Sequence, residues 1–200
     1  VYAWIDGEFQ AVAHYSTALY KLVPTERGPP TFEIDGVKML PSAHVSPYAD
    51  AMRKVALVEP RDSRMLDTCG GLGYFAACCL TAGAREVVSC EKSPAVLWLR
   101  QYNPWSPAAD ARLRLMTADI LQAITAFEVA AFDAVLHDPP RFGTAGELYS
   151  LAFYTELARV LKRNGRLFHY TGSPNALTSG RDVPAEVARR LQQAGFSTSF

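Results

Sequence analysis

The sequence predicts an α/β fold: a Rossmann-like, doubly wound, mostly parallel sheet with helices on both faces, plus a small N-terminal antiparallel β appendage. From Ser46 onward, apolar runs of strand length alternate with segments of helical periodicity, as in a parallel sheet with helical crossovers. Before Ser46, short β-like runs are separated by Asp-Gly pairs, which favour hairpins. We therefore expect residues 1–44 to form a substrate-side module and residues 45–200 the main domain.

Caps, apolar runs and turn residues predict the elements of the main domain in order. Ser46-Pro47 is a cap followed by a proline at the first helical position, so a helix is expected to about Leu57. The expected strands are Arg64–Cys69, Glu86–Glu91, Leu113–Thr117, Phe132–His137 and Arg166–Tyr170. The later helices are expected at Phe75–Ala82, Pro94–Tyr102, Ile120–Phe127, Leu148–Leu161 and Val183–Ala194.

The last residues, Phe196–Phe200, are expected to begin another strand. Sheets of this kind usually continue for a further strand, so truncation of the chain at its C-terminus is one interpretation of this sequence. Such a strand could also pair with a second copy of the chain, so a homodimer stays open as well.

Composition narrows the class of protein. Two hundred residues, of which 49% are hydrophobic and 20% charged, suit one globular domain with a full core. Twenty basic residues balance twenty acidic ones, so no net positive field favours nucleic acid, and the apolar runs are too short to span a membrane. The four cysteines match no zinc spacing; we expect free buried thiols, no metal and a reducing, cytoplasmic location.

Residues 65–76 contain a strand, a glycine-rich turn and a helix start. Gly71 and Gly73 let a ligand approach the backbone, and the helix N-terminus offers free N–H groups. Glu91 closes the next strand, where a carboxylate can accept both hydroxyls of a ribose. The loop also satisfies the dinucleotide pattern G-x-G-x-x-A. Asp67 argues for another ligand, because a carboxylate at the strand end would repel a pyrophosphate and suits the ammonium of S-adenosylmethionine.

The spacing Asp67-x-Cys69-x-Gly71-x-Gly73 resembles motif I of class I methyltransferases, D-x-G-x-G-x-G, with Cys69 in place of the first glycine. The resemblance covers about residues 46–200 and implies that this loop, Cys69 included, holds the methionine part of S-adenosylmethionine. It also implies that Glu91 holds the ribose. Asp119 is placed like the acid that accepts from the adenine amino group, and equally as a helix N-cap before Ile120.

A closer resemblance is to a group of predicted methyltransferases best known from archaea. The shared strings are Leu-Asp-Thr-Cys-x-Gly-Leu-Gly-Tyr (66–74), Asn-Pro-Trp-Ser (103–106), His-Asp-Pro-Pro-Arg-Phe (137–142), Ala-Gly-Glu-Leu-Tyr-Ser (145–150) and Phe-His-Tyr-x-Gly (168–172). This resemblance implies the fold and the cofactor and leaves the substrate open.

Asp138-Pro139-Pro140-Arg141 follows the strand that ends at His137. Proline has no N–H, so the strand ladder stops and leaves a carboxylate and free carbonyls at the sheet edge. The motif resembles [D/N]-P-P-[Y/F/W] of amino-methylating enzymes, in which the acid and the first proline carbonyl accept hydrogen bonds from an –NH₂ group. Arg141 replaces the stacking aromatic residue and could instead pair with a carboxylate or phosphate.

Three further residues are expected on the substrate side: Phe142, Tyr149 and His169. His169 could accept a proton from the acceptor. His137 points away from Asp138 by strand alternation, so a packed, hydrogen-bonded role is typical of it.

These residues lead to four hypotheses. The first is an S-adenosylmethionine-dependent methyltransferase acting on a nitrogen of a small amine, an RNA base or a protein side chain. The others are an aminopropyltransferase that uses decarboxylated S-adenosylmethionine, an NAD-dependent oxidoreductase and a non-catalytic binding scaffold.

Overall fold

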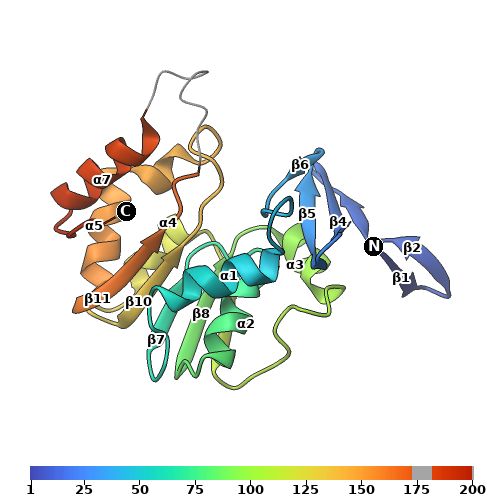
Figure 1. Cartoon of the computed structure of the whole chain (residues 1–200), viewed down its shortest axis with the longest axis horizontal. Coiled ribbons are helices and arrows are strands. Elements are labelled where there is room, and N and C mark those ends of the chain that lie inside the picture. The colour runs from blue at the N-terminus through green and yellow to red at the C-terminus, as the bar shows by residue number, and fades with distance from the viewer. Residues whose placement is uncertain (173–181, 200) are drawn as a thin grey trace.

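The computed structural model describes residues 1–172 and 182–199 and confirms the predicted fold class (Figure 1). Its centre is a five-stranded sheet of order β11-β10-β7-β8-β9, in which every neighbouring pair is parallel. Two small antiparallel sheets precede it, one of two strands and one of four.

The N-terminal strands form hairpins, and two of these, β1–β2 and β5–β6, turn at the Asp-Gly pairs. β1 (Tyr2–Ile5) pairs with β2 (Glu8–Ala11), and the second sheet contains β3 (Ala13–Tyr15), β4 (Leu19–Thr25), β5 (Gly28–Ile34) and β6 (Val37–Lys38). Asp6 and Gly7 both have positive φ, at 51° and 89°. This is the type I′ geometry that matches the twist of the flanking strands, so the hairpin prediction is confirmed.

Strands and helices then alternate along the chain. The strands are β7 (Arg64–Asp67), β8 (Glu86–Glu91), β9 (Leu113–Thr117), β10 (Phe132–His137) and β11 (Leu161–His169). The helices are α1 (Pro47–Ala56), α2 (Tyr74–Thr81), α3 (Pro94–Gln101), α4 (Ile120–Ala123), α5 (Leu151–Val160) and α7 (Val183–Gln193), with 3-10 turns η1 (Ile124–Ala126) and η2 (Gly146–Tyr149). Among the described residues, no helix is both long and apolar enough to cross a membrane.

Strand alternation divides the apolar residues between two cores. Met65 and Val87 pack with α1, α2 and α3 on one face of the sheet, together with Phe32 from β5. Leu66 and Val88 pack with α4, α5 and α7 on the other face. The central strands β7, β8 and β10 therefore bury both faces, as expected of a parallel sheet covered by helices, whereas the edge strand β9 is partly exposed.

The strand order reverses between β7 and β10, which lie side by side with Leu136 opposite Asp67. β8 and β9 continue the sheet on one side of this pair, and β11 completes it on the other. The carboxyl ends of β7 and β10 thus form a topological switch point, where open α/β sheets bind ligands.

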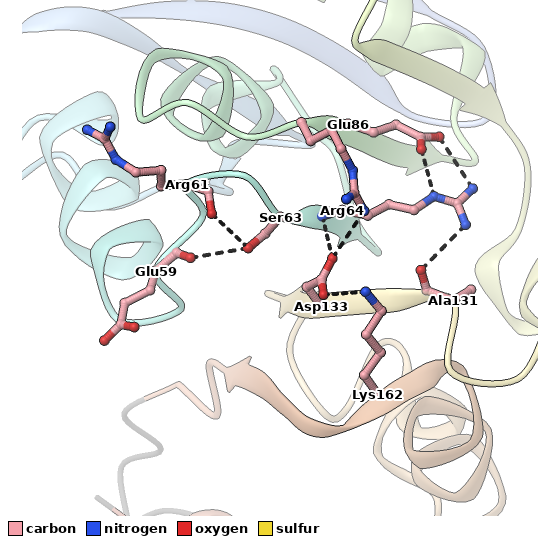
Figure 2. Close-up of polar contacts among 9 residues, drawn as sticks. Glu59, Arg61, Ser63, Arg64, Glu86, Ala131, Asp133 and Lys162 are labelled. Atoms are coloured by element: carbon pink, nitrogen blue, oxygen red, sulfur yellow. Dashed lines mark hydrogen bonds and ion pairs between the residues drawn. The ribbon is translucent and has the colours of Figure 1, made fainter.

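Charged residues join the strands at the opposite, amino-terminal edge (Figure 2). Arg64 donates from Nε and Nη2 to both oxygens of Glu86, and its backbone N–H donates to Asp133 Oδ2 at 2.8 Å. Lys162 Nζ pairs with Asp133 Oδ1. These contacts tie β7 and β11 to β10, and β8 to β7.

Four sequence predictions differ from the structure. The predicted helix Ile120–Phe127 divides into α4 and η1, and the predicted helix Leu148–Leu161 divides into η2 and α5, with Leu161 in β11. β11 begins at Leu161 rather than Arg166, because its first residues bulge beside β10 before regular pairing starts at Ala134 and Arg166. Residues 196–199 form no strand, so that expectation is wrong for them; residue 200 lies outside the described residues. The Phe196 N–H donates to the Leu191 carbonyl at 3.0 Å. This hydrogen bond satisfies a carbonyl in the last turn of α7, so the segment caps that helix.

Candidate active site

Four of the predicted acidic residues lie at the carboxyl edge of the parallel sheet. Asp67 ends β7 and Glu91 ends β8. Asp119 follows β9 by two residues, and Asp138 directly follows β10. The parallel arrangement of the strands therefore brings to one edge residues that are up to 71 positions apart in the sequence.

The glycine loop is packed tightly against the protein beneath it. Gly71 and Gly73 have φ of 50° and 83°, a conformation that side chains disfavour. A Cβ atom at Gly73 would lie 2.5 Å from the guanidinium carbon of Arg100 on α3, and one at Gly70 would lie 2.5 Å from Ser89 Oγ. The loop glycines thus meet a steric requirement of the fold.

Asp67 is a buried carboxylate with one unsatisfied oxygen. Ser89 Oγ donates to its Oδ2 at 2.8 Å, whereas its Oδ1 has no partner among the described residues. Burial raises the pKa of Asp67 to about 6, although Ser89 and the Arg100 guanidinium oppose the shift. Arg100 also has one unpaired buried nitrogen, Nη1. A cation brought close to Asp67 would favour its ionised form.

Glu91 is held in place by backbone amides. The Gly71 N–H donates to Glu91 Oε2 at 2.9 Å, and the Ser93 N–H donates to Oε1 at 2.8 Å. Each oxygen keeps further accepting capacity. The structure therefore connects the carboxylate at the end of β8 directly to the glycine loop.

Asp119 is the N-cap of α4. Its Oδ1 accepts from the Leu121 N–H at 3.0 Å, and its Oδ2 lies 3.8 Å from Lys92 Nζ. The N-cap prediction is confirmed, and the second predicted role, at an adenine, remains a prediction.

Cys69 lies between Asp67 and the loop glycines. Burial raises the pKa of its thiol well above the ordinary value, so the side chain stays uncharged. All four cysteines are free thiols.

Asp138 is paired with a lysine that is not among the predicted site residues. Lys54 on α1 is buried, and its Nζ lies 3.0 Å from Asp138 Oδ2 and 2.8 Å from Asp50 Oδ2. Burial raises the pKa of Asp138, and the Lys54 charge opposes that shift. The Asp138 side chain keeps 18% of its surface exposed, so a ligand can reach it.

The two prolines differ in what their carbonyls do. Tyr149 OH donates to the Pro140 carbonyl at 3.0 Å, which fixes the end of the motif. Within residues 1–172 and 182–199, nothing donates to the Pro139 carbonyl or to Asp138 Oδ1. These are the two acceptor positions that the motif predicts for an amine.

The remaining predicted substrate residues lie around this motif. Arg141 is exposed. Phe142 packs edge-on against Tyr149, with ring centroids 5.3 Å apart, and Arg190 of α7 lies 6.0 Å from its ring centre. Tyr149 itself is 1% exposed, so its ring packs in the interior, and its contact with the motif is the hydrogen bond from its hydroxyl to Pro140.

The two histidines of the site, His137 and His169, are neutral and hydrogen-bonded. His137 is fully buried, with Nδ1 2.7 Å from Thr68 Oγ1 and Nε2 3.1 Å from the Leu148 carbonyl, so its predicted packing role is confirmed. His169 Nε2 lies 2.8 Å from Tyr154 OH, and its Nδ1 lies 3.1 Å from the Tyr170 carbonyl. Burial lowers the pKa of His169 to about 4. No cluster of three metal-ligating side chains occurs in the part of the chain that the structure describes.

Sequence reasoning missed Lys54, although a signal was present. Pro47, Ala51 and Val55 mark the buried face of α1, and Lys54 lies on that same face. A lysine on the apolar face of a helix must be paired, because an isolated buried ammonium is very costly. Arg100 carries the same signal, because it lies with Val96 and Leu99 on the buried face of α3.

The fold agrees with comparisons to known proteins. The model of a family described as S-adenosyl-L-methionine-dependent methyltransferase matches residues 96–199, just over half of the chain. The chain is 43% identical over 198 residues to the uncharacterized protein MJ1233 of Methanocaldococcus jannaschii, which covers 98% of this chain and 68% of that protein. It is 30% identical over 152 residues to polyamine aminopropyltransferase 2 of Streptomyces coelicolor, which covers 72% of this chain and 27% of that protein.

Solved structures share the fold at lower identity. A spermidine synthase in complex with the transition-state analogue AdoDATO matches with a TM-score of 0.75 at 18% identity, covering 91% of this chain and 64% of that one. An S-adenosylmethionine-dependent methyltransferase from Mesorhizobium loti matches with a TM-score of 0.56 at 16% identity, covering 76% of this chain and 81% of that one. The chain thus spans about two thirds of MJ1233 and of the spermidine synthase chain. It belongs to the S-adenosyl-L-methionine-dependent methyltransferase family, and its cofactor is S-adenosylmethionine.

Proposed function

We propose that this protein transfers a methyl group from S-adenosylmethionine to an amino nitrogen held by Asp138 and the Pro139 carbonyl. The observation that carries the proposal is the pair of acceptors next to the switch point, Asp138 Oδ1 and the Pro139 carbonyl. Neither receives a hydrogen bond from the described residues. An –NH₂ group has two N–H bonds and would satisfy both.

The residues of the carboxyl edge fit the cofactor. The unpaired Oδ1 of Asp67 suits the ammonium of the methionine part, beside the backbone of Gly71 and Gly73, with Cys69 supplying the adjoining backbone. Glu91 would hold the ribose hydroxyls and Asp119 the adenine amino group. When bound, the cofactor supplies an electrophilic methyl carbon on a positively charged sulfur.

The chain contributes mainly positioning. Hydrogen bonds to Asp138 and the Pro139 carbonyl would direct the nitrogen lone pair toward the methyl group, and orientation of this kind accounts for much of a transfer reaction. The Tyr149–Pro140 hydrogen bond keeps the motif rigid. Arg141, Phe142 and His169 would contact the rest of the acceptor, and residues 1–44 would act as a module that selects it. The acceptor classes are a small amine, an RNA base and a protein side chain.

The test is a methyl-transfer screen with labelled S-adenosylmethionine against amines, RNA and protein fractions. Asp138→Asn should lower transfer by about a hundredfold, because the oriented hydrogen bond is lost. Its affinity for S-adenosylhomocysteine should stay unchanged. Glu128→Asn, at an exposed acid, is the control for charge and should behave as wild type. Full activity of Asp138→Asn, or no transfer to any acceptor by a wild-type protein that binds the cofactor, would refute the proposal; the second result would favour a binding scaffold.

Aminopropyl transfer is the second candidate, favoured by the 30% identity to polyamine aminopropyltransferase 2. The two reactions differ in their products. Methyl transfer yields a methylated amine and S-adenosylhomocysteine, whereas aminopropyl transfer requires decarboxylated S-adenosylmethionine and yields methylthioadenosine. Mass spectrometry of products formed with each cofactor in turn distinguishes them.

A further inference from the structure

Lys54 is a buried cation at the acceptor site. Its side chain is 10% exposed, and its Nζ bridges Asp50 and Asp138 at 2.8 and 3.0 Å. Aromatic rings surround the same ammonium, with the centre of Tyr170 at 4.3 Å and those of Phe75 and Phe168 at 5.7 and 5.9 Å. The contacts come from four segments of the chain, so the ammonium is firmly held.

The charge at this position matters for methyl transfer to an amine. An alkylamine resembles a lysine side chain, whose ordinary pKa is about 10.4, so it is mostly protonated at neutral pH. An ammonium has no lone pair and cannot accept a methyl group. Without Lys54, Asp50 and Asp138 would present two carboxylates that stabilise the unreactive ammonium.

We propose that Lys54 is a positioning residue that sets the charge of the acceptor site, so that Asp138 binds the acceptor amine in its neutral, nucleophilic form. Lys54 occupies Asp138 Oδ2 and leaves Oδ1 for the acceptor, and its positive charge disfavours a second cation beside it. This inference rests on the proposed methyl transfer to nitrogen.

Methyl transfer to the neutral amine moves one positive charge from the sulfur of the cofactor to the nitrogen of the acceptor. The acceptor releases its proton to solvent on binding. The nitrogen lone pair then forms the N–C bond as the methyl C–S bond breaks, and the bonding electrons stay on sulfur. The products are neutral S-adenosylhomocysteine and a methylated ammonium.

Lys54 keeps its charge throughout the relevant pH range. Burial acts to lower its pKa, but Asp138 and Asp50 outweigh burial, so the pKa is raised. The other titratable groups that face Asp138 or Lys54 are Cys69, Tyr149 and Tyr170. Burial raises the pKa of both Cys69 and Tyr149, so neither gains a charge near neutral pH.

The test measures how n-butylamine binds to the full chain saturated with S-adenosylhomocysteine, by calorimetry from pH 7 to pH 9. If only the neutral amine binds, the apparent Kd falls about tenfold per pH unit, since the neutral fraction rises tenfold. Lys54→Gln keeps hydrogen-bonding capacity toward both carboxylates and removes the charge, so its Kd should be independent of pH. Lys54→Arg keeps the charge and should retain the wild-type slope.

Each outcome bears on the proposal. A wild-type slope in Lys54→Gln, or a flat profile in wild type, overturns it. Asp50→Asn retains Lys54 and should also show the wild-type slope, and a flat profile there overturns the proposal even if Lys54→Gln does not fold. A wild-type protein that binds S-adenosylhomocysteine but no n-butylamine at any pH also overturns it and excludes a small alkylamine as the acceptor, whereas transfer to an RNA base or a protein side chain is decided by the methyl-transfer screen.

Discussion

Gly73 and Arg100 are packed so closely that a single added Cβ atom would lie 2.5 Å from the guanidinium carbon. The guanidinium is buried beneath the glycine loop, on the side of α3. The shape of the loop is therefore set from below by a charged side chain as well as by glycine flexibility.

Gly73→Ala is expected to destabilise the protein and to weaken S-adenosylhomocysteine binding. A left-handed alanine costs about 1–2 kcal/mol, and the contact with Arg100 adds about 1–3 kcal/mol of overpacking. Urea unfolding and calorimetry measure the two effects. Gly195→Ala is a matched control, because Gly195 has φ of 99° but no atom within 4 Å of its added Cβ. Equal losses in the two variants would show that the Arg100 contact has no effect.

The raised pKa of Asp67, about 6, predicts a distinct pH dependence of stability. The unfolded-state pKa is about 3.9, so between about pH 4 and pH 6 the folded protein binds more protons than the unfolded one. Its free energy of unfolding should therefore fall as the pH rises through this window, by about 3 kcal/mol from Asp67 alone.

Asp67→Asn should remove this component, which is measured as the difference between wild-type and variant unfolding free energies at pH 4, 5, 6 and 7. The difference is needed because His169 affects stability in the opposite direction. Its pKa is lowered to about 4, so it contributes stability above about pH 6.5 that is lost as the pH falls toward 4. Parallel curves for wild type and variant would contradict the prediction.

Asp119→Ser should separate the two roles of Asp119. Serine is also a good N-cap, so the melting temperature should stay close to that of wild type, whereas Asp119→Ala should lose about 1 kcal/mol of stability. If the carboxylate also binds the adenine amino group, Asp119→Ser should weaken S-adenosylhomocysteine binding about tenfold, the loss of one charged hydrogen bond. Wild-type affinity in Asp119→Ser would leave the residue as a cap alone.

Local signals predicted most of the main domain. The bounds of β8, β9 and β10 agree with the predicted ranges because each apolar run ends at a turn, a cap or a proline. The predicted strand at Phe196 failed for a non-local reason, since a strand forms only where a neighbour supplies hydrogen bonds, and Phe196 bonds to Leu191 instead.

The acidic residues of the candidate site were predicted from the sequence, whereas its two cations, Lys54 and Arg100, were not. Asp67, Glu91 and Asp138 lie at strand ends, where topology alone brings them to one edge. Lys54 and Arg100 reach that region from helices that pack against the sheet, at distances set by helix packing. No spacing rule in the sequence relates residue 54 to residue 138, because the contact depends on how α1 is placed.

The ion pairs of Arg64, Glu86, Asp133 and Lys162 lie at the far end of the strands that carry the candidate site. Their carboxylates are matched by cations, whereas Asp67 at the other end is buried with an unpaired oxygen. The amino-terminal edge therefore satisfies its charges within the protein, whereas the carboxyl edge keeps an acceptor atom for a ligand. Substitutions at the amino-terminal edge could then adjust the folding free energy without altering the recognition of cofactor or acceptor.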